Sequence, residues 1–146
     1  MNENETRALV EEWVDAWNAA EPERMRALYT PDAVLYQAPQ KKALVGVDHI
    51  IERWHAVAGI ANDSRFTLRE LHVAGDTAIL EFNVAGTHTT RFLDFEPTGR
   101  GLDIDSCLVF KVENGKITKH TTYLDTATIL RALGLLEIPG VREEAA

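Results

Sequence analysis

The amino-acid sequence predicts an α+β fold in which N-terminal helices pack on a strongly curved antiparallel sheet. Apolar residues recur at three- and four-residue spacing as far as Gly59, which is the period of helices. From Phe66 to Leu124 they alternate instead, with no helical stretch between the alternating runs. Asn114-Gly115 stands between two such runs, and this pair is the strongest short hairpin signal. Helices followed by strands in this way are typical of the α+β class.

Three helices are expected in the first part of the chain. The first spans residues 4–20, and its apolar face holds Leu9, Val10, Trp13, Val14 and Trp17. Pro22 suits the first turn of a short second helix, which carries Met25, Leu28 and Tyr29 and which Pro31 ends. Gly46 opens a third helix with an apolar face formed by Val47, Ile50, Ile51, Trp54 and Val57.

Five strands are expected, at residues 33–38, 66–73, 78–85, 103–112 and 116–124. A long connection from Thr87 to Gly101 separates the third strand from the fourth. Asp125 then begins a last helix, whose apolar side holds Ile129, Leu130 and Leu133 and which Gly134 ends. Because no repeat or composition change interrupts the chain, we expect one domain over residues 1–146.

The composition excludes several classes of partner. The net charge is −8 and the 15 Lys and Arg residues form no basic stripe, so neither nucleic acid nor an anionic membrane surface is expected to bind. No apolar run reaches the ~20 residues needed to span a bilayer. Cys107 is the only cysteine and cannot form a disulfide within the chain, which favours a reducing compartment, the cytoplasm.

A twisted sheet of long strands curls, and helices laid on its concave side leave a conical pocket for a small hydrophobic molecule. Aromatic side chains would line this pocket: Trp17, Tyr36, Trp54, Phe82 and Tyr123. Tyr123 has the same strand parity as Asp125, which places it beside that carboxylate. Most of these aromatic residues suit an ordinary core equally well.

Asp125, His120 and His88 are the candidate catalytic residues. Asp125 would act as a general acid or base at the pocket rim, where desolvation raises a carboxyl pKa; it is equally a good helix N-cap, which lowers the pKa. His120 lies five residues before Asp125, on the opposite face of a regular strand, and is expected to be exposed or at an interface. His88 closes a strand and either hangs over the pocket mouth or lies in a solvated loop.

No metal or other cofactor is expected. His49 and His55 are six residues apart, which does not place both on one helical face for a zinc ion. The sequence has no phosphate-binding glycine loop and no Gly-x-Ser-x-Gly elbow, and Cys107 has no basic neighbour in sequence to lower its pKa.

Three stretches carry a family resemblance: Gly86-Thr87-His88-Thr89, Pro97-Thr98-Gly99-Arg100, and residues 110–117 leading to His120 and Asp125. With the order of elements, they resemble the nuclear transport factor 2-like superfamily and, within it, the SnoaL-like polyketide cyclase family, over nearly the whole chain. The resemblance implies a conical fold, a homodimer formed through the exposed sheet face, and an aldol-type ring closure with an aspartate at the position of Asp125.

The sequence departs from related patterns at several positions. Thr121 stands where many SnoaL-like sequences have tryptophan, and Thr90 replaces a glycine. Similar ketosteroid isomerases have a carboxylate base near Gln37 or Ala38 and a tyrosine near Trp13, and this chain has neither. Limonene epoxide hydrolases use an arginine with two aspartates, which the strand around Glu81 lacks.

The resemblance and the residues together favour a cofactor-free enzyme, an acid–base cyclase or isomerase that acts on a hydrophobic, polyketide-like carbonyl compound. Asp125 would move the proton, with His88 or His120 assisting by a hydrogen bond. The alternative is a domain that binds a hydrophobic ligand or mediates dimerisation without any chemistry, because one fold hosts many functions.

Overall fold

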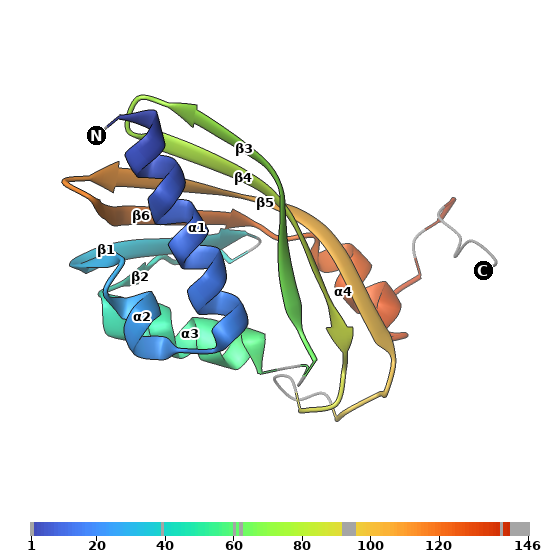
Figure 1. Ribbon diagram of the computed structural model, residues 1–146. Helices are drawn as coiled ribbons and strands as arrows, with labels where there is room; N and C mark the ends of the chain where they lie inside the picture. The colour runs from blue at the N-terminus through green and yellow to red at the C-terminus, as the bar shows by residue number, and fades with distance from the viewer. Residues whose placement is uncertain are drawn as a thin grey trace.

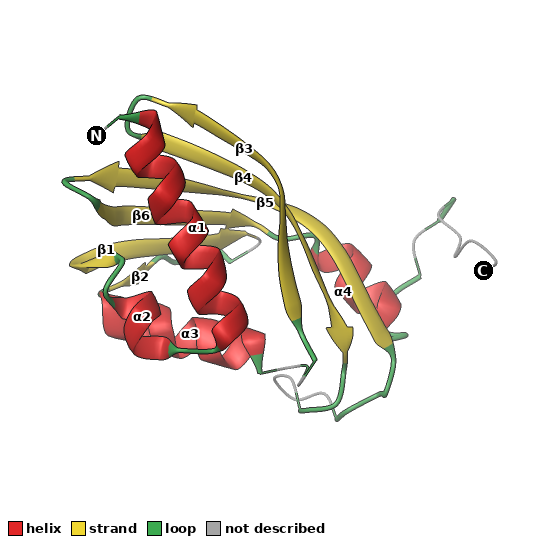
Figure 2. Ribbon diagram, in the orientation of Figure 1, coloured by secondary structure: helices red, strands yellow, loops and turns green. Residues whose placement is uncertain are grey.

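A computed structural model describes residues 2–38, 40–59, 61, 63–91, 96–137 and 139–140. The described part contains a six-stranded sheet of order β2-β1-β6-β5-β4-β3, with helices packed against it, which confirms the α+β prediction (Figures 1 and 2). The elements in chain order are α1 (Glu3–Ala19), α2 (Pro22–Arg26), β1 (Tyr29–Ala38), β2 (Leu44–Val45), α3 (Val47–Ala58), β3 (Arg65–Ala74), β4 (Thr77–Thr87), β5 (Gly101–Glu113), β6 (Lys116–Tyr123) and α4 (Thr126–Ala132).

Helix α1 begins with a capping box, in which Asn2 and Glu5 each accept a hydrogen bond from the other's backbone N–H. Its apolar face is buried on the sheet, where Val10 is fully enclosed and Trp13 nearly so. Helix α2 starts at Pro22, as expected, but it ends at Arg26. No described helix combines the length and the apolar character needed to cross a membrane.

The prediction that Pro31 ends the second helix is wrong. Tyr29 already belongs to β1, and Pro31 lies inside that strand. The pairing between β1 and β6 is irregular between Tyr29 and Val34. A proline is tolerated there because an interrupted ladder does not require its missing N–H.

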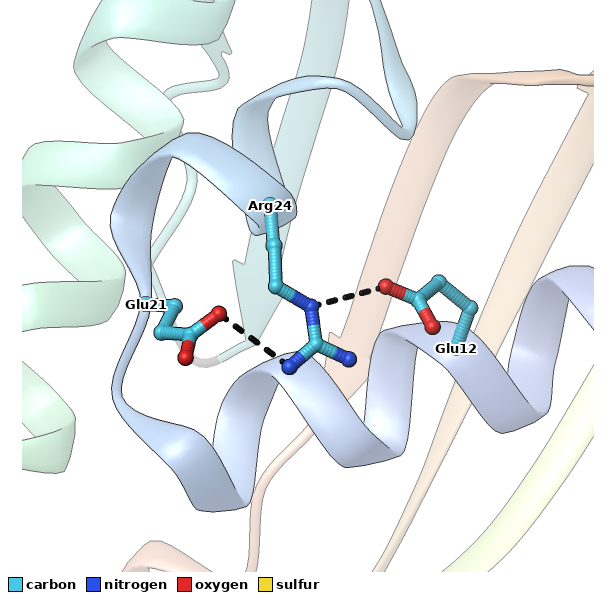
Figure 3. Close-up of polar contacts among 3 residues, drawn as sticks. All are labelled: Glu12, Glu21 and Arg24. Carbon is cyan, nitrogen blue, oxygen red and sulfur yellow. Dashed lines mark hydrogen bonds and ion pairs between the residues drawn. The ribbon is translucent and has the colours of Figure 1, made fainter.

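Arg24 joins the first two helices (Figure 3). Its Nε donates to Glu12 Oε1 at 2.9 Å and its Nη1 donates to Glu21 Oε2 at 3.1 Å. The hydrogen bond from Arg24 lowers the pKa of the Glu12 carboxyl. Because all three side chains are well exposed, the ion pairs orient α2 more than they stabilise the fold.

Strands β3 to β6 pair with their sequence neighbours in antiparallel fashion, as predicted. Strand β1 differs, since it runs parallel to β6 with Leu35 opposite His120. The prediction of an antiparallel sheet is therefore wrong for the pairing of β1 with β6. Alternation of apolar residues identifies a strand but not the direction of its partner, and a long connection allows either direction.

The two faces of the sheet differ in character. The inner face carries apolar residues that pack against α1 and α3, among them Leu35, Phe66, Leu80, Phe82, Leu108 and Phe110. The outer face carries the alternate positions, such as Glu81, Asp105 and Lys111. Figure 1 shows α1 lying across the strands while β3, β4 and β5 bend away toward α4.

The bent ends of these strands form a second layer of packing. Leu102 and Ile104 of β5 pack with Ile129 and Leu133 of α4. Gly86 of β4 receives the segment after α3, because a Cβ there would lie 2.7 Å from the Cβ of Ala61. This contact sets how closely the end of α3 approaches the end of β4.

We predict that Gly86→Ala destabilises the protein by about 1–3 kcal/mol, because the new methyl group overlaps Ala61 and the backbone of Ser64. Urea unfolding followed by circular dichroism measures the change. Gly101→Ala is the matched control, since a Cβ at Gly101 meets no atom within 4 Å. Equal unfolding free energies for the two variants would contradict the close approach at Gly86.

Candidate functional site

A chain of buried polar groups crosses the inner face. Trp13 Nε1 donates to Tyr29 Oη at 2.9 Å, and this hydroxyl lies 2.9 Å from His120 Nδ1. The other ring nitrogen, His120 Nε2, lies 2.8 Å from Thr122 Oγ1. The four side chains come from α1, β1 and β6, so they meet only because β1 and β6 pair in parallel register.

The direction of these hydrogen bonds follows from the donors. An indole N–H can only donate, so Tyr29 Oη accepts from Trp13 and its own proton goes to His120 Nδ1. The neutral imidazole then carries its proton on Nε2 and donates to Thr122 Oγ1. The hydroxyl proton of Thr122 is therefore not used in these hydrogen bonds.

Burial keeps these groups neutral. Desolvation lowers the pKa of His120 from 6.5 to about 3 and raises the pKa of Tyr29 well above its usual value. The prediction that His120 is exposed or at an interface is therefore wrong. His120 does lie on the face opposite to Tyr123, but this face is the inner one, and Tyr29 supplies the polar partner that the sequence did not reveal.

The polar chain ends where the inner face becomes partly accessible. Thr122 is half-buried, and its neighbour on β1 is Gln37, also half-buried. Within the described part of the chain, the Gln37 side chain makes no hydrogen bond. Ser106 of β5 is half-buried on the same face and accepts the backbone N–H of Asp125 at 3.1 Å. Neutral hydroxyl and amide groups thus gather at this end.

Asp125 has the geometry of a helix N-cap. Its carboxylate accepts from Thr128 N at 3.1 Å and from Thr128 Oγ1 at 2.5 Å, and the residue is exposed. Of the two roles considered from sequence, the structure contains the capping contacts.

His88 directly follows β4, opposite Arg100, and is completely buried. Its Nδ1 accepts the backbone N–H of Thr98 at 3.2 Å and lies 3.0 Å from Thr98 Oγ1. Among the described residues, its Nε2 has no hydrogen-bond partner, and the same is true of Trp54 Nε1 on α3. The expectation of a solvated loop residue is thus wrong for His88, because its backbone continues the β4–β5 ladder into the core.

The predicted ligand-binding aromatic residues divide between the two faces. Trp17, Trp54 and Phe82 are buried in the inner core. Tyr36 and Tyr123 lie on the outer face, so placing them around an inner pocket was wrong. Tyr123 is 55% exposed. The alternation of side chains along a strand does not place Tyr123 beside Asp125, because β6 ends at Tyr123 and α4 begins at Thr126.

The outer face carries a hollow of about 600 Å³, lined by Arg69, Glu81, Phe82, Asp105, Ser106, Cys107 and Tyr123. Burial and the nearby charge of Glu81 raise the pKa of Cys107, which keeps its thiol protonated. His72 Nε2 lies 2.7 Å from Glu81 Oε2 at the surface. No group of three or more His, Cys, Asp or Glu residues in the described ranges could hold a metal ion.

Sequence reasoning assigned no site role to three residues of these arrangements: Gln37, Thr122 and Thr98. It placed Tyr29 at the end of the second helix and not on a strand beside His120. Strand parity could have indicated that Thr122 shares a face with His120, since the two are separated by two positions. Nothing local could have paired Tyr29 or Gln37 with β6, because the register of a parallel pair is set far along the chain.

The sequence matches the SnoaL-like domain family over residues 10–120. A comparison with curated proteins gives no match. AclR of Streptomyces galilaeus, a proposed hydroxylase, superimposes with a TM-score of 0.84 at 22% identity, over 95% of this chain and 87% of AclR.

Two further solved structures are described as proposed polyketide cyclases. One is a SnoaL-like protein from Jannaschia sp. CCS1, with a TM-score of 0.85, 17% identity, and coverage of 92% of this chain and 95% of that one. The other is IdmH of Streptomyces antibioticus, with a TM-score of 0.77, 24% identity, and coverage of 88% and 97%. At such identities these likenesses establish the fold, which is nuclear transport factor 2-like. The family match shows that this chain belongs to the SnoaL-like domain family.

We predict that His120 makes the protein less stable as the pH falls. The folded state has a His120 pKa of about 3, and the unfolded chain regains a value of about 6.5. Between these values only the unfolded state binds the proton, so the unfolding free energy is fully retained above about pH 6.5 and declines below it. This linkage corresponds to about 2 kcal/mol between pH 7 and pH 5.

The unfolding free energy of the wild type and of His120→Gln should be measured by urea titration at pH 7 and pH 5. Glutamine hydrogen-bonds but does not titrate, so the variant should lose less stability over this interval. All other ionisable groups are common to both proteins and cancel in the comparison. An equal loss in both would mean that His120 is not held neutral.

Proposed function

We propose that this protein binds a small, largely apolar carbonyl compound on the inner face of its sheet and acts on it by cofactor-free acid–base catalysis. One observation carries the proposal. Among the described strand residues, the inner face holds no Asp, Glu, Lys or Arg, and its half-buried end offers only the neutral groups of Gln37, Ser106 and Thr122.

An uncharged surface of this kind suits a ligand that is itself uncharged. Burying an ion without a partner is costly, whereas an apolar body with one carbonyl oxygen needs only a hydrogen-bond donor. The hydroxyl of Thr122 is available to hydrogen-bond a polar group of the ligand, because His120 supplies the hydrogen bond that its oxygen accepts. The neutral, buried chain behind Thr122 keeps the hydroxyl oriented.

Asp125 is the proposed proton-transfer group. Its backbone N–H is bonded to Ser106, which connects it to the half-buried end of the inner face. Its carboxylate oxygens lie at the start of α4, where they contact Thr128, and Asp125 would act as the proton acceptor. Removal of a proton next to a carbonyl group is the step that cyclases and isomerases of this type share.

Membership of the SnoaL-like family supports this reaction class. Two of the similar structures are described as proposed polyketide cyclases. We therefore propose a polyketide-like carbonyl compound as the substrate and cyclisation or isomerisation as the reaction. His88 and His120 would assist through hydrogen bonds. Trp17, Trp54 and Phe82 would contribute the apolar walls.

A non-catalytic ligand-binding or dimerisation domain is the second candidate. It is favoured by the exposure of Asp125, whose carboxylate already contacts Thr128, and by the low pKa of His120, which makes this histidine a weak base. We also propose a homodimer formed through the outer face, where Tyr123 is exposed, one domain spanning residues 1–146, and a cytoplasmic location.

Deuterium exchange into 2-tetralone, a small apolar ketone, tests the catalytic proposal by proton NMR in D₂O. We predict that the wild type accelerates exchange at the carbon atoms next to the carbonyl group. Asp125→Asn should reduce this acceleration by about 10²-fold or more, because the amide cannot accept the proton. Asparagine caps helices as well as aspartate does, so the fold should be unchanged.

Thr128→Ala is the matched control, since it removes a capping contact and leaves the Asp125 charge in place. Undiminished exchange in Asp125→Asn would exclude the catalytic role of Asp125. If the wild type binds the ketone without exchanging its protons, the ligand-binding alternative is supported instead.

A further inference from the structure

The backbone around His88 is held as a continuation of the sheet. His88 N donates to Arg100 O at 2.9 Å, and Gly99 N donates to His88 O at 2.9 Å. The pairing of Thr87 with Gly101 therefore extends by one more residue. Because side chains alternate along a strand, His88 points to the same side as Gly86, which is the inner face.

Thr98 determines which nitrogen of His88 carries the proton. The backbone N–H of Thr98 points at Nδ1 from 3.2 Å, and a backbone N–H can only donate. The Thr98 hydroxyl accepts from Arg100 N at 3.2 Å, which leaves its own proton for Nδ1 at 3.0 Å. Two donors thus converge on Nδ1, so this nitrogen is unprotonated and the neutral ring has its proton on Nε2.

The resulting Nε2–H group is buried and has no acceptor in the described part of the chain. Leaving such a donor without a partner costs about 1–3 kcal/mol. The indole N–H of Trp54 is in the same condition. The contact between Ala61 and Gly86 brings the segment after α3, seven residues beyond Trp54, against the end of β4, two residues before His88.

We propose that His88 Nε2–H, assisted by Trp54 Nε1–H, binds the carbonyl oxygen of the ligand, and that Thr98 is the positioning residue that holds His88 in this tautomer. The inference rests on the proposed function and adds the group that the ligand must present. Both donors are neutral, and no Lys or Arg side chain lies among the described strand residues of the inner face. A neutral ketone or ester carbonyl therefore suits these two donors.

The tautomer is tested first, without any ligand. Two-dimensional NMR of protein labelled with ¹⁵N in histidine should show His88 with its proton on Nε2 and with Nδ1 unprotonated. His88→Gln identifies the resonance by its loss. A proton on Nδ1 would overturn the inference, because the two Thr98 donors could not then both point at this nitrogen.

Binding is tested with two probes of similar shape, 2-acetylnaphthalene and 2-ethylnaphthalene, of which only the first has a carbonyl group. Fluorescence titration gives the Kd of each. His88→Asn keeps an acceptor near the Nδ1 position but loses the inner donor, so ketone binding should weaken about tenfold and hydrocarbon binding by less than about twofold. His88→Gln extends an amide N–H to the Nε2 position and should restore most of the ketone affinity.

Trp54→Phe removes the second donor while keeping an aromatic ring, and it should show the same ketone-selective loss. Thermal unfolding shows whether His88→Asn folds. If it does not fold, Trp54→Phe still tests whether the buried donors bind the ketone. An equal loss for both probes in these variants would overturn the role of the two donors and leave the proposed function intact. If neither probe binds the wild type, the proposed function fails, and the ligand assignment fails with it.

Discussion

The hydrogen bonds that join Trp13, Tyr29 and His120 are the interaction on which the inner face depends. They connect α1 to the parallel pair β1 and β6, across the junction where the chain would otherwise bury three unpartnered polar groups. A buried polar network is costly when one member is missing, so the three residues specify how the helix sits on the sheet. Phe66 and Phe110 pack edge-on against Trp13 and exclude water from this junction.

The two buried histidines, His120 and His88, differ in how their ring nitrogens are hydrogen-bonded. His120 has both ring nitrogens bonded to neighbours and holds Thr122 in place. His88 is bonded through Nδ1 only, and its second nitrogen faces the interior without a partner. The described residues satisfy the first arrangement completely, whereas they leave the Nε2–H of the second without an acceptor. This difference separates a structural histidine from the one proposed to bind the ligand.

Charge is distributed between the faces in a way that suits an apolar ligand. The inner face is neutral, while Arg69, Glu81 and Asp105 line a hollow on the outer face. Asp125 lies outside the core, where its carboxylate caps α4 and its backbone is bonded to Ser106. Acid–base chemistry by Asp125 therefore requires a substrate that extends from the inner face to the start of α4.

The sequence by itself determined the class of the fold, the order of its helices and its five longer strands, and the hairpin at Asn114-Gly115, because periodicity, caps and turn residues are local properties. It did not reveal the two-residue strand β2, which is too short to show a period. It also identified His88 and Asp125 as residues to examine, and it anticipated the cap at α4. The tertiary structure alone decided that β1 runs parallel to β6 and that Tyr36 and Tyr123 face outward. It likewise decided that Tyr29 hydrogen-bonds the buried His120 and that Thr98 orients His88, since each pairing joins residues whose separation in the chain leaves no periodic trace.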